Sequence, residues 1–281
     1  MAQLAVPAAR RDSYWLADGR IYTHTSDGHR VFLDATDLHI SLHVLDHGNW
    51  EPQVRDAMMR ILRPGDTFVD VGSNIGLHTL FGASIVGQTG RVHAFEALPR
   101  MAEMTRLNAE INGLDPIVSV HSIAVADTVG EREFSDFASH GAMSGFAVDN
   151  TRLEKFGEVG ASSVKQTRVS TTTIDAMLDG KRVDLIKADI EGFEYLMLKG
   201  AARTIEANPS MAMIIEWEPW YANKVLAPNA TDGAIEIISR AGYTAHIARY
   251  GESLQPVAIS NLAEVNGKGD LVLTRGARRI P

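Results

Sequence analysis

One stretch near residue 70 constrains the fold of this chain more than any other. Residues 65–79 read GDTFVDVGSNIGLHT, which is a turn, a short apolar run, a glycine turn and the start of an apolar helix. The run 68–71 has the length and composition of a buried strand, and Leu77 and Leu80 follow at helical spacing. A strand, a glycine turn and a helix in succession predict the opening of a nucleotide-binding α/β unit.

The same alternation continues along the chain. Residues 91–96 read as a second buried strand, a helix begins at Pro99, and residues 117–120 read as a third strand. Strands that alternate with helices predict a parallel sheet with right-handed crossovers. Further strands are predicted at 183–189, 211–216, 243–248 and 270–274, and an edge strand at 164–170.

The N-terminal part is predicted to form a small extension. Two β-prone runs at 20–24 and 29–33 flank an Asp-Gly turn, which predicts a hairpin, and a histidine-rich helix follows. We therefore expect an extension over 1–50 and one large domain over 51–281. The chain has 281 residues, 45% of them hydrophobic, which is enough for a substantial core.

Two histidines of the extension raise the question of a metal site. His39 and His43 have the i, i+4 spacing that places both on one face of a helix. No carboxylate completes a recognisable ligand pattern, so polar residues on a surface helix are the favoured interpretation.

The composition limits the partners and the compartment. A formal net charge of −8 disfavours extended contact with nucleic acid. The chain has no cysteine, which fits a reducing cytosol and excludes a cysteine nucleophile. No apolar run approaches the roughly 18 residues of a membrane span, and the first arginines follow the apolar residues, the wrong order for a secretory signal. We expect a cytoplasmic protein without a nucleic-acid partner, and its oligomeric state stays open.

Acidic residues fall at the ends of the predicted core strands. They are Asp70, Glu96, Asp189 and Glu216. Sheets of this kind bind their ligands at the carboxyl ends of the strands. The sequence therefore predicts an acidic ligand site at that edge.

The glycine turn at 72–76 is not built for phosphate. Asn74 stands where a dinucleotide fold places its middle glycine, and Asp70 before the turn would repel a phosphate but suits an α-amino group. Glu96 lies twenty positions after Gly76, where an acid accepts hydrogen bonds from ribose hydroxyls. A ligand with a ribose, an amino group and no phosphate indicates S-adenosylmethionine. The alternative is a plain Rossmann-like turn with incidental acids.

Four motifs carry a resemblance to a known family. They are DVGSNIGLHT at 70–79, FEALP at 95–99, DLIKADIEGFE at 184–194 and IIEW at 214–217. Over roughly residues 45–220 the chain resembles the FkbM family of class I methyltransferases. The Asp-Ile-Glu-Gly-x-Glu motif is the most discriminating part, and the upstream Trp50-Glu51-Pro52 is similar to that family as well.

The resemblance implies a fold, a reaction and a site. The fold is the α/β, Rossmann-like class I methyltransferase fold, with a mostly parallel seven-stranded sheet, helices on both faces and a reversed final hairpin. The reaction is methyl transfer from S-adenosylmethionine to a hydroxyl of a sugar or a polyketide-type natural product. The cofactor-binding residues that it implies are Asp70, Gly72, Ser73, Asn74, Gly76, Thr79, Glu96, Ser122 and Ala124. The residues that it implies for the acceptor side and for catalysis are Asp189, Glu191 and Glu216.

Two catalytic schemes stay open for these three carboxylates. A carboxylate can take the proton of the acceptor hydroxyl as a general base, and His78 and His140 are further candidates for this role. Alternatively, a divalent metal such as magnesium, held by oxygen ligands, could lower the pKa of the hydroxyl. The metal-free scheme is favoured because nothing in the spacing proves a metal site.

The acceptor is a small molecule or a glycan whose identity the sequence does not reveal. Residues 127–163 and the aromatic residues Trp217, Trp220 and Tyr221 are expected to shape its pocket. The competing functions are a non-catalytic S-adenosylmethionine-binding scaffold, a nicotinamide-dependent oxidoreductase and an RNA methyltransferase. The oxidoreductase is disfavoured because the sequence lacks the middle glycine of a nicotinamide-binding turn. The RNA methyltransferase is disfavoured because the sequence shows no basic surface interleaved with aromatic residues.

Overall fold

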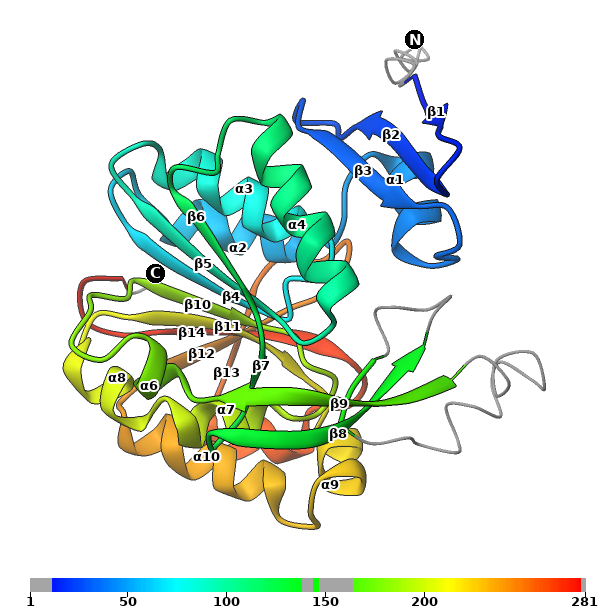
Figure 1. Ribbon diagram of the computed structural model, residues 1–281. Coiled ribbons are helices and arrows are strands. Elements are labelled where there is room, and N and C mark those ends of the chain that lie inside the picture. The colour runs from blue at the N-terminus through cyan, green and yellow to red at the C-terminus, as the bar shows by residue number, and fades with distance from the viewer. Residues whose placement is uncertain (1–11, 138–143, 147–163, 279–281) are drawn as a thin grey trace, which may run out of the picture.

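The computed structural model describes residues 12–137, 144–146 and 164–278 (Figure 1). Its central element is a sheet of eight strands in the order β13-β12-β14-β11-β10-β4-β5-β6. The strands of its parallel part are β4 (Thr67–Val71), β5 (Arg91–Glu96), β6 (Val118–Ser122), β10 (Leu185–Ala188) and β11 (Ala212–Trp217). The strands that pair in antiparallel fashion beyond β11 are β14 (Gly269–Thr274), β12 (Thr244–Ala248) and β13 (Gln255–Val257).

The expected α/β fold is confirmed, with one correction to the sheet. β14 lies antiparallel between β11 and β12, which is the expected reversed hairpin. The sheet has eight strands rather than seven, because β13 pairs with the outer edge of β12. Three residues with Pro256 at their centre show no strand pattern in the sequence, and proline is tolerated there because the strand is at an edge.

Helices cover both faces of the sheet, as expected. Alternation along β4 turns Phe68 toward one apolar layer and Val69 toward the other. The helices on the first face are α2 (Pro52–Ile61), α3 (Leu77–Val86) and α4 (Pro99–Ile111) (Figure 1). Those on the opposite face are α6 (Ile174–Met177), α7 (Glu194–Gly200), α8 (Ala202–Ala207) and α10 (Ala230–Arg240).

A separate three-stranded sheet lies between β6 and β10 along the chain. It consists of β7 (Ala124–Val125), β8 (Gly130–Phe137) and β9 (Val164–Thr172) in the order β7-β9-β8. The predicted strand at 164–170 is part of β9 and pairs on one side only, with β8, whereas β7 pairs with Thr171 and Thr172. The remaining elements are α9 (Pro219–Val225) and the 3-10 helices η2 (Ile259–Glu264) and η3 (Gly276–Arg278). Within the described ranges, no helix combines the length and the apolar character needed to cross a membrane.

The N-terminal strands form their own sheet, and hydrogen bonds join this sheet to α4. This sheet consists of β1 (Tyr14–Trp15), β2 (Arg20–His24) and β3 (Arg30–Asp34), and α1 (Ile40–His47) follows it. β2 and β3 pair as the predicted hairpin. The buried Asn108 side chain accepts from Phe32 N at 2.7 Å, and its amide donates to Phe32 O at 3.1 Å and to Ile75 O at 2.8 Å. One side chain of α4 thus fixes both the hairpin and the glycine turn.

We expect Asn108→Ala to lower the free energy of unfolding by about 3 kcal/mol, because it leaves buried backbone groups of Phe32 and Ile75 without partners at about 1–3 kcal/mol each. Asn112→Ala is the matched control. Its side chain bonds Arg30 N and Arg30 O in the same manner, but at a partly exposed position where water can replace it. Urea unfolding measures both variants, and equal losses would contradict the assigned role.

Candidate functional site

A pocket opens beyond the carboxyl ends of β4, β5 and β10. It encloses about 840 Å³, including the open space at its mouth. The candidate site residues from the sequence analysis that line it are Gly72, Ser73, Asn74, His78, Glu96, Ala124, Asp189 and Glu191. Strand ends and the loops that follow them therefore bring together segments more than a hundred residues apart in the sequence.

The glycine turn touches the loop that follows β10. Gly72 has a φ of 76°, and a Cβ added to it would lie 2.1 Å from the carbonyl oxygen of Asp189. No side chain fits in that gap. Asn74 is in the left-handed region as well, with a φ of 51°. The backbone of the glycine turn therefore lies directly against the backbone of Asp189, and both line the pocket.

Glu96 joins the end of β5 to the glycine turn. Its Oε2 accepts from Asn74 N at 2.8 Å, and its Oε1 accepts from Leu98 N at 2.9 Å. Burial raises the pKa of Glu96 above its usual value, although both N–H donors oppose this shift. Each carboxylate oxygen keeps acceptor capacity beyond these bonds, so Glu96 can still bind a hydroxyl in the pocket.

Four of the predicted cofactor residues lie outside the pocket lining. Asp70 is fully buried and accepts from Thr79 Oγ1 at 2.6 Å, so both lie behind the turn. Gly76 has a φ of 87°, and its Cβ would lie 2.8 Å from Thr105, so α4 packs closely there. Ser122 is exposed at the end of β6, whereas Ala124 lines the pocket.

Lys187 is a buried cation in the pocket wall that the sequence analysis did not single out. Its Nζ lies 3.8 Å from Asp70 Oδ1 and 3.8 Å from Asp189 Oδ2. Burial would lower the pKa of Lys187, but the carboxylates of Asp189 and Asp70 outweigh it and raise the pKa. A lysine in the middle of the apolar β10 was the available signal, since such a residue is almost never buried unless it is paired.

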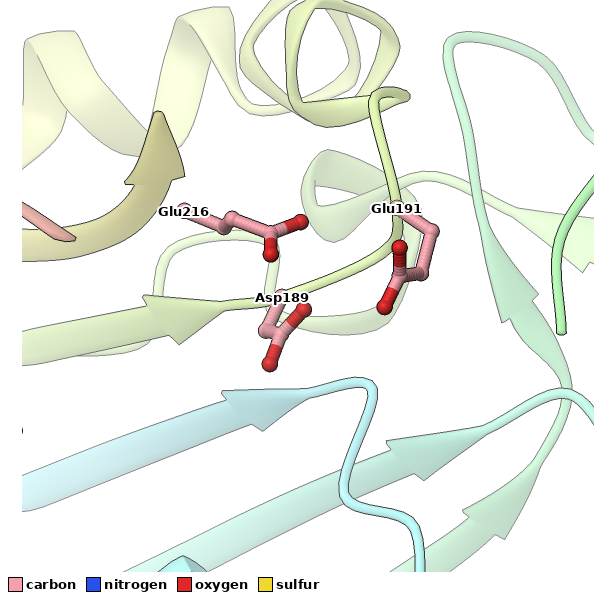
Figure 2. A group of neighbouring side chains, drawn as sticks. All are labelled: Asp189, Glu191 and Glu216. Carbon is pink, nitrogen blue, oxygen red and sulfur yellow. The ribbon is translucent and has the colours of Figure 1, made fainter. Parts of the chain in front are cut away.

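Three carboxylates converge beside the glycine turn. Asp189 and Glu191 extend from the loop after β10, and Glu216 extends from β11, with their oxygen atoms within 4.8 Å of one another (Figure 2). We call Asp189, Glu191 and Glu216 the acid cluster. Asp189 and Glu191 line the pocket, whereas Glu216 lies behind them. Glu191 has a φ of 58°, a strained conformation of the kind that occurs at functional sites.

Two carboxyls at this site, Glu216 and the adjacent Glu194, have raised pKa values. Burial raises the pKa of Glu216 well above its usual value, and Asp189 and Glu191 raise it further, while the ion pair with Lys268 opposes them. Burial likewise raises the pKa of Glu194 to about 8, against the hydrogen bond from Ile190 N at 2.9 Å. Glu216 and Glu194 therefore hold protons more tightly than free carboxyls do.

The other aromatic and histidine candidates lie apart from the pocket or take other roles. Trp217 is a core residue whose Nε1 donates to Leu262 O at 2.9 Å, and Trp220 is 65% exposed. Tyr221 is buried outside the pocket lining. His140 lies outside the described residues, as do 138–143 and 147–163 of the loop region.

His39 and His43 form no metal-ligand cluster. Their rings pack against Trp50, with ring centroids 5.2 Å apart in each pair. Over the described ranges, the acid cluster is the one group of His, Asp and Glu side chains that could hold a metal ion.

Comparison with known proteins places these features in a family. The family model described as the methyltransferase FkbM domain matches residues 70–245. The 31-O-demethyl-FK506 methyltransferase FkbM of Streptomyces tacrolimicus is 39% identical over 88 residues, which cover 31% of this chain and 33% of that protein. The AMB antimetabolite synthetase AmbE of Pseudomonas aeruginosa is 27% identical over 168 residues, which cover 50% of this chain and 8% of the synthetase. The chain thus spans a third or less of the length of these two relatives.

Further similarities concern a fungal enzyme and solved structures. Methyltransferase sdnD of Sordaria araneosa is 25% identical over 178 residues, 56% of this chain and 68% of that protein. Methyltransferase FkbM from Methylobacillus flagellatus has a TM-score of 0.45 and 16% identity, and covers 83% of this chain and 52% of its own. The O-methyltransferase from Bacillus cereus in complex with SAH has a TM-score of 0.46 and 14% identity, over 84% of this chain and 86% of its own.

Proposed function

The chain belongs to the FkbM family of S-adenosylmethionine-dependent methyltransferases, and from this premise we propose that it methylates a hydroxyl oxygen of a sugar or polyketide-type molecule. The name of the Streptomyces relative, a 31-O-demethyl-FK506 methyltransferase, specifies oxygen as the methylated atom in that protein. The observation that carries the proposal is the contact between the glycine turn and the Asp189 loop. It sets carboxylates beside the cofactor turn, where an acceptor hydroxyl needs a base.

The lining of the pocket fits S-adenosylmethionine by its chemistry. The cofactor supplies a methyl group activated by its sulfonium. Glu96 would accept hydrogen bonds from the ribose hydroxyls, and the backbone of Gly72, Ser73 and Asn74 would contact the methionyl part. Ala124 would lie near the adenine, together with apolar neighbours in the lining. Asp70 and Thr79 support the turn from behind, Gly76 ends it, and Ser122 lies outside the pocket lining.

Asp189 is the residue that we assign as general base. It lines the pocket, its side chain is 21% exposed, and Lys187 Nζ lies 3.8 Å from its Oδ2. Glu191 also lines the pocket and would orient the acceptor. Glu216 lies behind both and binds Lys268, so its part is to hold this lysine beside the cluster. A base in this position takes the hydroxyl proton as the oxygen attacks the methyl group.

Two lysines supply positive charge beside the acid cluster, which a metal ion would supply in the alternative scheme. The oxygen donors of the acid cluster suit a hard cation such as magnesium. However, Lys268 already pairs with Glu216, and Lys187 lies beside Asp189. Their ammonium groups neutralise part of the negative charge that would attract the ion. The proposed mechanism is therefore metal-free.

Methyl transfer from labelled S-adenosylmethionine is expected to proceed in excess chelator, because the base is a side chain rather than a metal-bound group. The assay incubates the protein with a panel of glycosides and macrolides and follows both S-adenosylhomocysteine and the methylated product by mass spectrometry. Loss of turnover in chelator, with recovery on adding magnesium, would overturn the metal-free mechanism. Cofactor binding without any methylated product would favour a scaffold.

Glu96→Ala is expected to weaken S-adenosylhomocysteine binding by at least about tenfold, because hydrogen bonds to a buried carboxylate are lost. Isothermal titration calorimetry measures the affinity. The control is Glu103→Ala, which removes an acid of α4 whose side chain is 61% exposed. An unchanged affinity in Glu96→Ala would remove this residue from the cofactor site.

A further inference from the structure

One wall of the pocket is supplied only in part by the family-matched region. Ile40 and Trp50 line the pocket together with Leu77 and His78 of α3. The matched region begins at residue 70, so Ile40 and Trp50 both precede it. Three of these four side chains are apolar, and Asp189 and Glu191 of the acid cluster line the same pocket. The pocket thus combines an apolar wall with carboxylates.

Neighbouring rings hold Trp50 in its place in this wall. The indole makes edge-to-face contacts with His39 at 85° and with His43 at 89°, and the ring centroids are 5.2 Å apart in both pairs. Aromatic pairs in this arrangement contribute about 0.5–1.5 kcal/mol beyond the burial of their area. Two such contacts orient the ring at the pocket wall.

The backbone of Glu51 is strained next to Trp50. Glu51 has a φ of 45° and directly precedes Pro52. Residues before proline favour extended conformations, and a left-handed conformation costs a non-glycine residue about 1–2 kcal/mol. Among the described residues, the other non-glycine positions with positive φ are Asn74 and Glu191, and both line the pocket. Strain of this kind persists where surrounding contacts impose it, and it gathers at ligand sites.

A buried pair with His78 holds Glu51 in this conformation. His78 Nε2 lies 3.0 Å from Glu51 Oε2, and the side chains are 6% and 14% exposed. Burial raises the pKa of Glu51, but the hydrogen bond and charge of His78, with Lys187 and Lys268, lower it to about 2. The carboxylate is ionised at neutral pH, so Nε2 is the donor. The pair ties the segment that carries Trp50 to the helix that follows the glycine turn.

We propose that Trp50 contacts the apolar face of a hydroxyl-bearing ring in the acceptor, and that Glu51 is a positioning residue that holds Trp50 against the pocket through His78. The inference rests on the proposed hydroxyl acceptor. An apolar wall does not suit the charged methionyl end of the cofactor, because burying a charge without a partner is costly. The C–H face of a six-membered ring suits it, and the hydroxyl can then reach the acid cluster.

Fluorine NMR of protein labelled with 5-fluorotryptophan tests the contact without requiring turnover. The chain has 4 Trp residues, so each resonance can be assigned with one Trp→Phe variant. Cyclohexanol is added to the complex with S-adenosylhomocysteine, and ethylene glycol serves as a hydroxyl compound without a ring face. The Trp50 resonance is expected to move with cyclohexanol and not with ethylene glycol. The resonance of Trp220, an exposed indole outside the pocket lining, should move with neither.

Three results would overturn the inference. They are a Trp50 resonance that responds to S-adenosylhomocysteine but not to cyclohexanol, an equal response to ethylene glycol, and an equal response of Trp220 to cyclohexanol. If S-adenosylhomocysteine does not bind the wild-type protein at all, the proposed function fails instead. The two failures are therefore distinguishable.

Glu51→Gln tests the positioning role. We expect this variant to shift the Trp50 resonance in the free protein and to weaken cyclohexanol binding by about tenfold, because a charged hydrogen bond is replaced by a neutral one. The affinity for S-adenosylhomocysteine and the resonance of the buried Trp217 should be unchanged, which separates positioning from general loss of structure. Glu103→Gln, at an exposed ion pair, is the control. An unchanged Trp50 resonance and cyclohexanol affinity in Glu51→Gln would contradict the role.

Discussion

Asp189→Asn is expected to reduce turnover by about 10²- to 10⁴-fold, which is the usual contribution of a general base. The amide keeps the shape of the carboxylate but cannot take the proton of the acceptor hydroxyl. The cofactor affinity should be retained, because the contact of Asp189 with Gly72 is made by its backbone carbonyl oxygen rather than by its side chain. Turnover is measured with saturating acceptor, and cofactor affinity by calorimetry.

Two further variants make the Asp189→Asn result interpretable. Glu191→Gln, in the same cluster, is expected to raise the KM for the acceptor more than it lowers kcat, because we assign Glu191 to orientation. Asp56→Asn removes an acid from an exposed i, i+4 pair with Arg60 and should have no effect. Full turnover in Asp189→Asn would remove this residue from the catalytic machinery, and a larger loss of kcat in Glu191→Gln would transfer the role of base to Glu191.

Gly72→Ala is expected to abolish measurable binding of S-adenosylhomocysteine and to destabilise the fold. The added Cβ would lie 2.1 Å from the carbonyl oxygen of Asp189, which is backbone and cannot rotate away. The glycine turn and the Asp189 loop must therefore separate, and both line the pocket. Calorimetry with S-adenosylhomocysteine and urea unfolding measure the two effects.

Gly242→Ala separates the steric clash from backbone strain. Gly242 has a φ of 74°, close to the 76° of Gly72, but nothing lies within 4 Å of the Cβ that would be added there. We expect Gly242→Ala to lower the free energy of unfolding by about 1–2 kcal/mol, the cost of a positive φ in alanine, and to bind the cofactor normally. Wild-type affinity in Gly72→Ala would show that the contact between the two loops is not needed for binding.

Local patterns were sufficient for the parallel strands of the central sheet, the glycine turn and several pocket residues. The apolar run before Gly72 forms β4, and Asn74 and Glu96 lie together, joined by a hydrogen bond of 2.8 Å. These predictions succeed because period-two burial and the conformational freedom of glycine act over a few residues. β13 was missed for the complementary reason, since its three residues pair only because β12 offers a free edge.

Long-range contacts decided the electrostatics of the site. The sequence analysis placed Asp70 and Thr79 against the cofactor. In the structure they are hydrogen-bonded to each other behind the glycine turn, outside the pocket lining. Lys187 and Lys268, which lie 81 residues apart in number, each approach one acid of the cluster. No spacing rule relates residues on different strands, because their distance depends on strand order.

The stretch from Gly65 to Thr79 thus predicted by itself the nucleotide-binding α/β unit, and together with Glu96 it predicted a nucleoside ligand without phosphate. The family motifs added methyl transfer, and the strand-end acids indicated where it would occur. The apolar wall was decided by the tertiary structure alone. Trp50 and Glu51 precede the glycine turn by some twenty residues, and Trp50 reaches the pocket only because α2 packs on the sheet and His78 of α3 binds Glu51. Such a pairing depends on how helices pack over strands, which local sequence does not encode.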